Sequence, residues 1–372
     1  MHSFISFLSE AAILHIEHPS DRLFDGPQAA KHALKTLKQV SAGKAPTMTR
    51  KIDDKMSFNV IRRADGKVGV KYKGSGSHYN FSEKDIEEQH GHKQYLAHPL
   101  KLLLKHLPKV LPHTPGEYQG GYMSDRASRE HENGKISHTP NTIKYAADVD
   151  SPEGKALAKS KVSAVIHTKI TSGGPKPLTS LEGFGHHPDV HLVPHLVSKE
   201  HAIVPKEYKS PADQHLKKAE ELMGSHGFEH LKGHEQTLRQ YINSTVTTDE
   251  TPSAEGYKGY LRRWHQKKID AVKTEKAKTA KKKVMDDMID HVSKHQKEFY
   301  KTLEIHHHLQ QATNHLSRGL DAFGAGGFHT SIGGEASGGE GHVYNGLKVV
   351  DREGFSKANR ARSEILRASR GK

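Results

Sequence analysis

The chain of 372 residues contains no cysteine. It therefore has no disulfide framework and no thiolate metal site, which is typical of a reducing compartment. Aromatic residues make up 6% of the sequence and hydrophobic residues 33%, so long solvated helices or loops must dilute the core. No apolar run approaches the ~20 residues that span a bilayer. We expect a soluble protein without a membrane partner.

Positive charge is abundant: 57 Lys and Arg face 43 Asp and Glu, a formal net charge of +14. This balance favours a polyanionic partner such as nucleic acid, and a generally soluble basic surface is the alternative. Residues 273–283 hold six lysines and no large apolar residue, so they form either a solvated helix face or a nucleic-acid contact. The lysines are Lys273, Lys276, Lys278, Lys281, Lys282 and Lys283.

The chain has 31 histidines, and many of them would add positive charge below pH ~6.5 and strengthen polyanion binding. Two groups, residues 186–191 and 306–308, invite a metal interpretation. Zinc ligands must converge in space, however, and a histidine triplet on a helix points in several directions. We therefore expect structural or surface roles for most of these histidines.

The N-terminus, residues 1–14, is expected to form a short helix whose apolar face carries Phe4, Phe7, Leu8 and Ala11. It lacks the basic start of a secretion signal. Residues 1–11 resemble the capsid-targeting leader of internal proteins in large tailed phages. That resemblance implies cleavage after Glu10, in Leu8-Ser9-Glu10. A plain helix docked on the domain is the alternative.

Residues 15–173 carry the signals of an α+β core. Two β-rich runs, 56–61 and 68–73, flank Asp65-Gly66, which is a strong hairpin signal. Apolar residues at helical spacing predict helices over 28–40 and 96–107. The remaining expected elements are strands at 117–123, 143–147 and 162–168, and a helix at 151–159.

The composition changes after about residue 173. Residues 174–209 are rich in Pro, Gly and His and are interpreted as an extended connection, and residues 210–322 are helical almost throughout. Residues 323–372 begin with a Gly-rich loop, and Asn345-Gly346 then joins two short strands. The simplest architecture is an antiparallel β core interrupted by a helical insertion and completed by the terminal hairpin.

The tetrapeptide Lys51-Ile52-Asp53-Asp54 stands at the head of the paired strands. A lysine nucleophile must be partly deprotonated, so it needs nearby cations or burial. Basic residues on the same expected sheet meet that need for Lys51. The repeat of the tripeptide at Lys268 lies in a charged helix and does not. Asp53 is expected to orient the lysine or to help bind a metal.

The motif order resembles the lysine-adenylating nucleotidyltransferases, namely DNA ligases, RNA ligases and capping enzymes. Short segments within residues 15–170 and 335–362 more closely resemble an uncharacterised ligase-like family of large marine tailed (myovirus) phages. These segments are His15-Ile16-Glu17-His18, Lys51-Ile52-Asp53-Asp54, Tyr118-Gln119-Gly120, His138-Thr139-Pro140-Asn141-Thr142-Ile143-Lys144-Tyr145 and His167-Thr168. The resemblance implies a ligase-type nucleotidyltransferase domain.

The same resemblance implies roles for individual residues. Lys51 would form a lysyl-AMP intermediate, supported by Asp53. Lys73 would lie near the ribose or phosphate, and Lys348 would contact the α-phosphate. Glu340 would bind metal or nucleotide. ATP and Mg²⁺ (or Mn²⁺) are the implied cofactors, and a nucleic-acid 5′ phosphate is the implied acceptor.

Two positions depart from the ligase pattern. Asp54 stands where the family has glycine, and Gly121 stands where the third motif has an acid. Glu117 is the nearest acid, in another register, and is taken as its replacement in nucleotide binding.

Two hypotheses follow. One is an active nucleotidyltransferase that acts on nucleic-acid ends in the host cytoplasm. The other is a non-enzymatic, DNA-binding internal virion protein on a degenerate ligase fold. An enzyme packaged in the phage capsid would satisfy both hypotheses.

Overall fold

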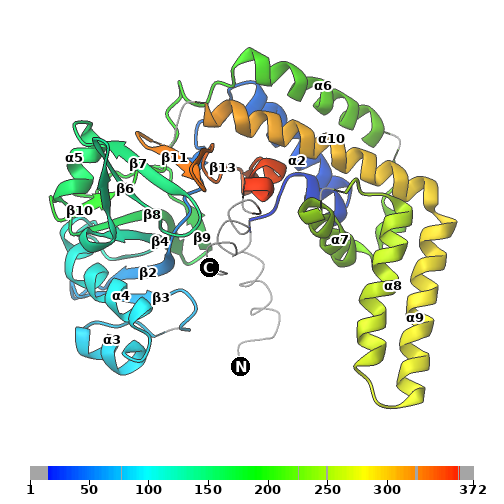
Figure 1. Cartoon of the computed structure of the whole chain (residues 1–372), viewed down its shortest axis with the longest axis horizontal. Coiled ribbons are helices and arrows are strands. Elements are labelled where there is room, and N and C mark those ends of the chain that lie inside the picture. Colours follow the sequence, from blue (N-terminus) through cyan, green and yellow to red (C-terminus); the bar gives the residue numbers. More distant parts are fainter. Residues whose placement is uncertain are drawn as a thin grey trace.

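The computed structural model describes residues 16–76, 78–224, 226–248, 250–322, 326–358 and 360. Over these ranges the chain has an α+β fold with mainly antiparallel sheets. Figure 1 shows the β half on the left and the helices on the right and along the top. The expected N-terminal helix and its cleavage site at Glu10 lie outside the described residues. Among the described helices, none is both long and apolar enough to cross a membrane.

The largest sheet has the strand order β10-β8-β4-β2-β3, and β9 pairs with β8. All its pairings are antiparallel except that of β10 with β8. Its strands are β2 (Met56–Arg62), β3 (Val68–Tyr72), β4 (Gly116–Asp125), β8 (Val162–Thr171), β9 (Gly174–Pro177) and β10 (Val190–Leu192). The hairpin predicted around Asp65-Gly66 is confirmed.

One face of this sheet is apolar and the other is polar. Phe58 and Val60 of β2 are fully buried in a cluster with Leu100 and Leu103 of α4 (Gln94–His106). A second helix, α3 (Glu83–His90), follows β3 and precedes α4. Since successive side chains of a strand alternate between faces, the intervening Ser57 and Asn59 point to the opposite side. That polar face is not covered by α4.

A second sheet has the order β12-β11-β7-β6-β5. Its strands are β5 (Glu130–Glu132), β6 (Lys135–His138), β7 (Lys144–Asp148), β11 (His329–Ile332) and β12 (Glu335–Ala336), with α5 (Pro152–Lys159) between β7 and β8. Strand β11 follows the helical insertion, yet it pairs with β7, so the chain returns to the β half after the helices.

The smallest sheet joins the two ends of the core. It consists of β1 (Thr49–Arg50), β13 (His342–Tyr344) and β14 (Leu347–Val349). The predicted terminal hairpin is confirmed, and both residues of its turn are left-handed, with φ of 48° at Asn345 and 73° at Gly346. Arg50 pairs with His342, which places the hairpin beside the start of the Lys51 motif.

The helical half contains α2 (Pro27–Ser41), α6 (Lys206–Met223), α7 (Glu235–Thr248), α8 (Ala254–Asp270), α9 (Glu275–Lys294) and α10 (Gln296–Asp321), together with the 3₁₀ turn η1 (Ser20–Asp25). With 26 residues, α10 is about 39 Å long at 1.5 Å per residue. It runs from the base of the α8–α9 hairpin to the β half (Figure 1).

Two expected boundaries were wrong. The segment 174–209 holds β9 and β10, and α6 already begins at Lys206. Both strands are too short to show alternation, and β9 contains two prolines, which suits an edge strand but hides it in sequence. The helical structure is also interrupted at residues 271–274, so Lys273 lies in the turn between α8 and α9.

Candidate active site

A cavity of about 300 Å³ lies on the polar face of the main sheet. Lys51, Lys73 and Lys348, three of the residues implied by the ligase resemblance, all line it. They come from the segment after β1, the end of β3 and β14. The structure therefore brings residues from before and after the helical insertion to one site.

Strand register places these side chains. Asn59 of β2 lies between Lys71 of β3 and Gln119 of β4. Ser57 and Gln119 line the cavity, and the backbone N–H of Lys73 donates to the carbonyl of Ser57 at 3.1 Å. Polar side chains of the neighbouring strands β2 and β4 therefore line the cavity together with the lysines.

Lys51 is held by the terminal segment. Its backbone N–H donates to the carbonyl of Gly341 at 2.8 Å, and its ammonium forms an ion pair with Glu340. The Lys51 side chain remains 29% exposed and that of Glu340 17%. Burial, followed by the charge of Lys51, lowers the pKa of Lys348. Lys51 is thus accessible and lies beside both a carboxylate and a second amine.

Asp53 faces away from the cavity. Its buried carboxylate accepts the backbone N–H groups of Thr142 at 2.6 Å and Ile143 at 2.9 Å, and the amide of Asn141 at 2.9 Å. Its own N–H donates to the hydroxyl of Tyr145. Asp53 thus ties the segment after Lys51 to the strand β7 region, and this arrangement suits positioning of the lysine rather than contact with a nucleotide.

Asp54 lies two residues before β2, and its side chain lies against Gly121 of β4. A Cβ added to Gly121 would lie 2.3 Å from Asp54 Cβ and 2.4 Å from its Oδ2. The Asp54 side chain lines the cavity, and its carboxylate accepts from Ser57 Oγ at 3.1 Å. The two positions that depart from the ligase pattern are therefore in contact, and Asp54 places a carboxylate beside Gly121.

Burial raises the pKa of Asp54 to about 6. This value is a net result. The charges of Asp53 and Glu340 act in the same direction as burial, whereas the Ser57 hydrogen bond and the Lys51 charge lower the pKa of Asp54. At pH 7 Asp54 is thus an ionised but readily protonated acid beside Lys51.

Glu117 lies elsewhere. It accepts from the amide of Asn59 at 3.1 Å and from the hydroxyl of Tyr79, and burial together with this bond raises the pKa of Tyr79. Among the described residues the cavity is lined by Gln119 rather than Glu117. The cavity that holds the three lysines is thus lined by the carboxylate of Asp54 and not by that of Glu117.

His167 and Thr168 of β8 also line the cavity, joined to each other by a hydrogen bond of 2.8 Å. Burial, together with the nearby charges of His195, Lys73 and Lys51, lowers the pKa of His167 to about 4. His167 is therefore neutral at pH 7. The adjacent pair in a strand was visible in the sequence, but no role followed from it.

Two carboxylates near Lys51 could take part in binding a divalent metal. In the described ranges no three or more His, Asp or Glu side chains are grouped to hold a metal ion. Mg²⁺, however, is commonly held by one or two carboxylates together with substrate phosphates and water. Asp54 and Glu340 flank Lys51 and interact electrostatically with each other, so they fit an ion that is shared with a nucleotide.

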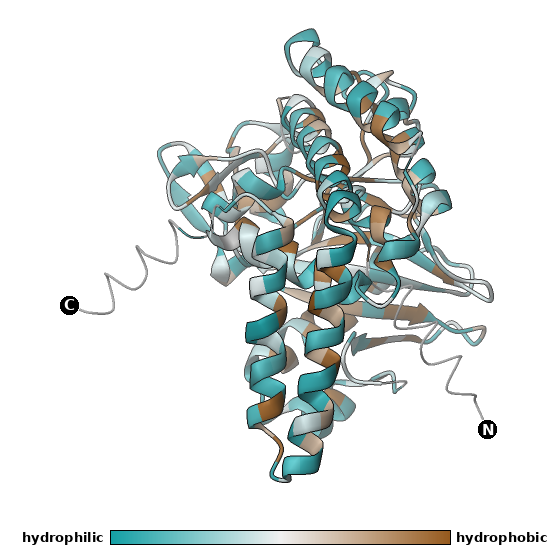
Figure 2. Ribbon diagram, turned by 90° about the vertical axis from the view of Figure 1, so that its right-hand side faces the viewer, coloured by the Kyte–Doolittle hydropathy of each residue, from teal (hydrophilic) through white to brown (hydrophobic). Residues whose placement is uncertain are grey.

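The lysines predicted to contact nucleic acid lie far from this cavity, on the α8–α9 hairpin (Figure 1). Between Lys258 and Lys283 there are eleven Lys or Arg and two Asp or Glu residues. Figure 2 shows both helices largely hydrophilic. The exposed lysines are Lys273, Lys276, Lys282 and Lys283, whereas Lys278 pairs with Glu275 and Lys281 is half-buried.

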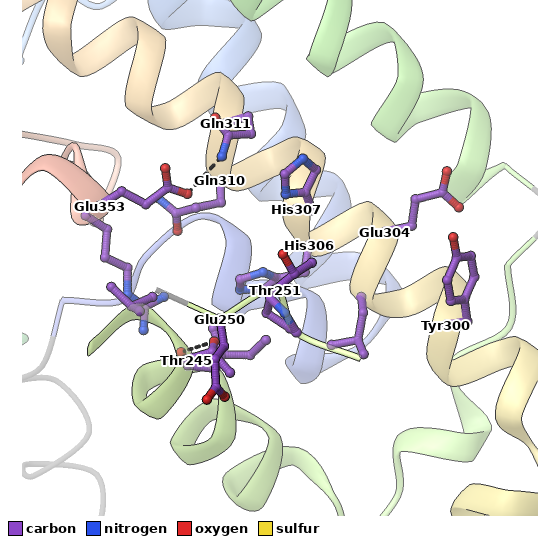
Figure 3. A pocket seen from close by; sticks show the side chains of 15 residues that line it. Thr245, Glu250, Thr251, Tyr300, Glu304, His306, His307, Gln310, Gln311 and Glu353 are labelled. Carbon is purple, nitrogen blue, oxygen red and sulfur yellow. Dashed lines mark hydrogen bonds between the residues drawn. The ribbon is translucent and has the colours of Figure 1, made fainter. Parts of the chain in front are cut away.

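A separate cavity of about 410 Å³ lies between α7, α10 and residues 352–353 (Figure 3). Its rim carries three carboxylates, Glu250, Glu304 and Glu353, and Gln311 donates to Glu353 at 2.8 Å. Arg352, which also lines this cavity, is held by Asp21 and Asn243. The three carboxylates therefore dominate the lining, which does not suit a nucleotide phosphate. The cavity on the main sheet therefore remains the candidate active site.

The histidines of the helical half are largely structural. His226 and His230 both contact the hydroxyl of Thr302 at 2.8 Å, and His306 bonds the buried Asp21 at 3.0 Å. Burial lowers the pKa of His230 to about 4. The expectation that histidines add charge near pH 6.5 is therefore wrong for these buried side chains.

Comparison with known proteins gives one result. A family model described as "Family of unknown function (DUF6267)" matches residues 14–363. This range includes the β half and the whole helical insertion. No curated protein and no solved structure matches the chain.

Proposed function

This chain belongs to the family of unknown function DUF6267, and for it we propose an ATP-dependent nucleotidyltransferase that forms a lysyl-AMP intermediate on Lys51 and acts on nucleic-acid ends. One observation carries the proposal. A single cavity is lined by Lys51, Lys73 and Lys348, and Glu340 forms an ion pair with the first of these lysines. Those are the positions that the ligase resemblance implies.

The first step is attack by Lys51 Nζ on the α-phosphorus of ATP. A nitrogen–phosphorus bond forms, the bond from the α-phosphorus to the bridging oxygen breaks, and pyrophosphate leaves. The amine must lose a proton before it attacks, and the ion pair with Glu340 holds the amine in the cavity. Lys73 and Lys348 line the same cavity and are placed to bind phosphate oxygens.

A bound Mg²⁺ or Mn²⁺ would neutralise charge on the phosphates. The carboxylates of Asp54 and Glu340 would hold it. Asp53 would keep the Lys51 segment in position through its three hydrogen bonds to residues 141–143. In the second step the nucleotidyl group passes to a nucleic-acid 5′ phosphate.

The arrangement of sheets supports a ligase-type fold for the β half. Lys51 follows β1, between the smallest sheet and the largest, and the terminal hairpin adds Lys348. The helical insertion between β10 and β11 is then an addition to that fold. It carries the most basic stretch of the chain.

A second candidate is a DNA-binding internal virion protein on a degenerate ligase fold. The basic α8–α9 hairpin, remote from the cavity, favours it. Both candidates place the protein with nucleic acid, in the host cytoplasm or inside a phage capsid. The active-site geometry favours the enzyme.

The test is incubation of purified protein with α-labelled ATP or GTP and Mg²⁺ or Mn²⁺, followed by denaturing electrophoresis. We expect label on wild-type protein and none on Lys51→Ala. Lys55→Ala, which removes an exposed lysine four residues away, serves as the matched control and should label normally. Absence of label from folded, unadenylated wild-type protein would support the virion scaffold.

A further inference from the structure

A second cavity of about 580 Å³ adjoins the candidate active site, and we call it the second compartment. The two cavities share five lining residues, and we call the pair the groove. The shared residues are Ile16, Thr168, Pro175, Pro177 and Val343.

The terminal hairpin runs along both compartments. Val343 and Lys348, a cross-strand pair, line the first compartment, whereas the turn residues Asn345 and Gly346 line the second. The backbone N–H of Lys348 donates to the carbonyl of Glu17 at 2.9 Å, which fixes the hairpin to the N-terminal segment. A ligand lying along this hairpin would reach from the second compartment to Lys51.

Two guanidinium groups and an imidazole enter the second compartment from the helical half. Arg22 lies on η1, His32 on α2 and Arg239 on α7. Both arginines pair with Asp25, Arg22 at 2.8 Å. Arg239 also lies 4.0 Å from the carboxylate of Glu17, which lines the compartment as well. The side chains of Arg22 and Arg239 stay 32% and 24% exposed, and a guanidinium has five N–H donors, so each arginine can pair with a carboxylate and still donate to a phosphate.

We propose that this second compartment binds the acceptor, a nucleic-acid strand with a 5′ phosphate. Its terminal phosphate would enter the Lys51 compartment, while Arg22 and Arg239 contact the following backbone phosphates. Arginine suits this role because its planar fork binds two phosphate oxygens at once. This inference rests on the proposed function and adds the place of the second substrate.

The transfer step moves the nucleotidyl group from Lys51 to the acceptor. A terminal phosphate oxygen of the acceptor attacks the α-phosphorus of the lysyl-nucleotide and forms an oxygen–phosphorus bond. The nitrogen–phosphorus bond breaks, and its electron pair returns to Lys51 Nζ, which takes up a proton. The product is a nucleic acid capped by a pyrophosphate-linked nucleotide.

A polymeric acceptor is favoured because the helix that carries Arg239 packs against the basic α8–α9 hairpin. Leu238 and Tyr241 of α7, the helix that carries Arg239, share one apolar cluster with Tyr257 and Leu261 of α8. The helix that faces the second compartment therefore also supports the basic α8–α9 hairpin.

The test separates the two chemical steps. Self-labelled protein is freed of ATP and mixed with a 5′-phosphorylated or a 5′-hydroxyl oligonucleotide, DNA or RNA, and label is followed on both molecules in a single turnover. We expect Arg239→Gln and Arg22→Gln to self-label within about twofold of wild type. Both should transfer label to the 5′-phosphorylated strand at least tenfold more slowly.

Arg63→Gln is the matched control, since it also removes an exposed arginine that pairs with an aspartate. Normal transfer by both groove variants would overturn the proposal. Equal loss of labelling and transfer would also overturn it, by assigning the arginines to the phosphates of ATP. So would transfer by wild type to neither DNA nor RNA.

Failure of the proposed function is distinguishable from failure of this inference. If wild-type protein does not self-label, binding of a fluorescent 5′-phosphorylated oligonucleotide is measured by anisotropy. Weaker binding by the groove variants than by Arg63→Gln would retain the nucleic-acid site without the enzyme. Unchanged binding would remove both. Arg22→Gln decides the matter if Arg239→Gln does not fold.

Discussion

The side chain of Asp54 occupies the space that a side chain on Gly121 would need. A Cβ at residue 121 would lie 2.3 Å from Asp54 Cβ, a distance that real structures do not show. Asp54 also stands where the ligase pattern that the sequence resembles has glycine. Relative to that pattern, a glycine and an acid are exchanged between the segment before β2 and strand β4, and one carboxylate stays at this place.

This exchange predicts a double-mutant result. Gly121→Asp alone should reduce self-labelling at least tenfold, because it adds a clash and a second carboxylate at one place. Asp54→Gly alone should reduce it similarly by removing the carboxylate. The double variant Asp54→Gly with Gly121→Asp should label better than either single variant. The measurement is the initial rate of self-labelling, with thermal unfolding as a control for folding.

Additive losses in the double variant would contradict the exchange. Residues in contact normally show coupling of about 0.5–3 kcal/mol. A coupling of zero would mean that Asp54 and Gly121 act independently.

The raised pKa of Asp54 predicts a pH-dependent stability. Its folded-state pKa of about 6 exceeds the ordinary value of 3.8. The stability from this group is therefore fully present below 3.8 and is lost as pH rises through 6. Asp54→Asn removes that loss, so its unfolding free energy should exceed that of wild type by up to about 3 kcal/mol at pH 8.

This difference should stay nearly constant from pH 8 to about 6 and shrink as the pH falls below 6 toward 3.8, and thermal unfolding from pH 8 to 5 measures the onset of that decrease. Asp65→Asn, at the exposed hairpin turn, is the control and should show no such trend. A constant difference between Asp54→Asn and wild type at all pH values would show that Asp54 ionises normally.

Buried histidines predict acid lability of the whole fold. His138 stacks on Tyr145, and burial lowers its pKa to about 3. Burial lowers the pKa of His342 to about 3 as well. The stability from such groups is present above pH 6.5 and is lost as pH falls toward their folded values. We expect cooperative unfolding with uptake of several protons between about pH 6 and 4.

His138→Phe should move the acid midpoint to lower pH, because a phenyl ring keeps the stacking and cannot take a proton. His186→Gln, at an exposed histidine, should leave the midpoint unchanged. Circular dichroism across a pH titration measures both. Equal midpoints for the two variants would refute the role of His138.

The α8–α9 hairpin predicts a salt-sensitive contribution to nucleic-acid binding. Replacing the exposed Lys276, Lys282 and Lys283 by Gln should weaken binding about tenfold or more at low salt. The slope of log K against log salt should fall by about 0.7–0.9 for each lost phosphate contact. Self-labelling should be unchanged, since these residues lie far from the cavity. The triple variant at Lys84, Lys93 and Lys155, exposed lysines of the β half, is the control.

Local signals predicted much of the fold. Asp65-Gly66 and Asn345-Gly346 identified two hairpins, and helical spacing identified α2 and α4. The short strands β9 and β10 escaped because they lack alternation. Sequence spacing alone does not bring Lys51 to Lys348 across the whole insertion, and only the order of motifs suggested it. Asp54 and Gly121 looked like two defects because their contact depends on the register of β2 and β4.

The central claim is that Lys51 carries the nucleotide. The most direct measurement is mass spectrometric peptide mapping of wild-type protein after incubation with ATP and Mg²⁺. We predict an adenylyl adduct on the peptide that contains Lys51, with the modified atom on that lysine. An adduct on another residue, or no adduct on fully covered peptides of folded protein, would contradict the account.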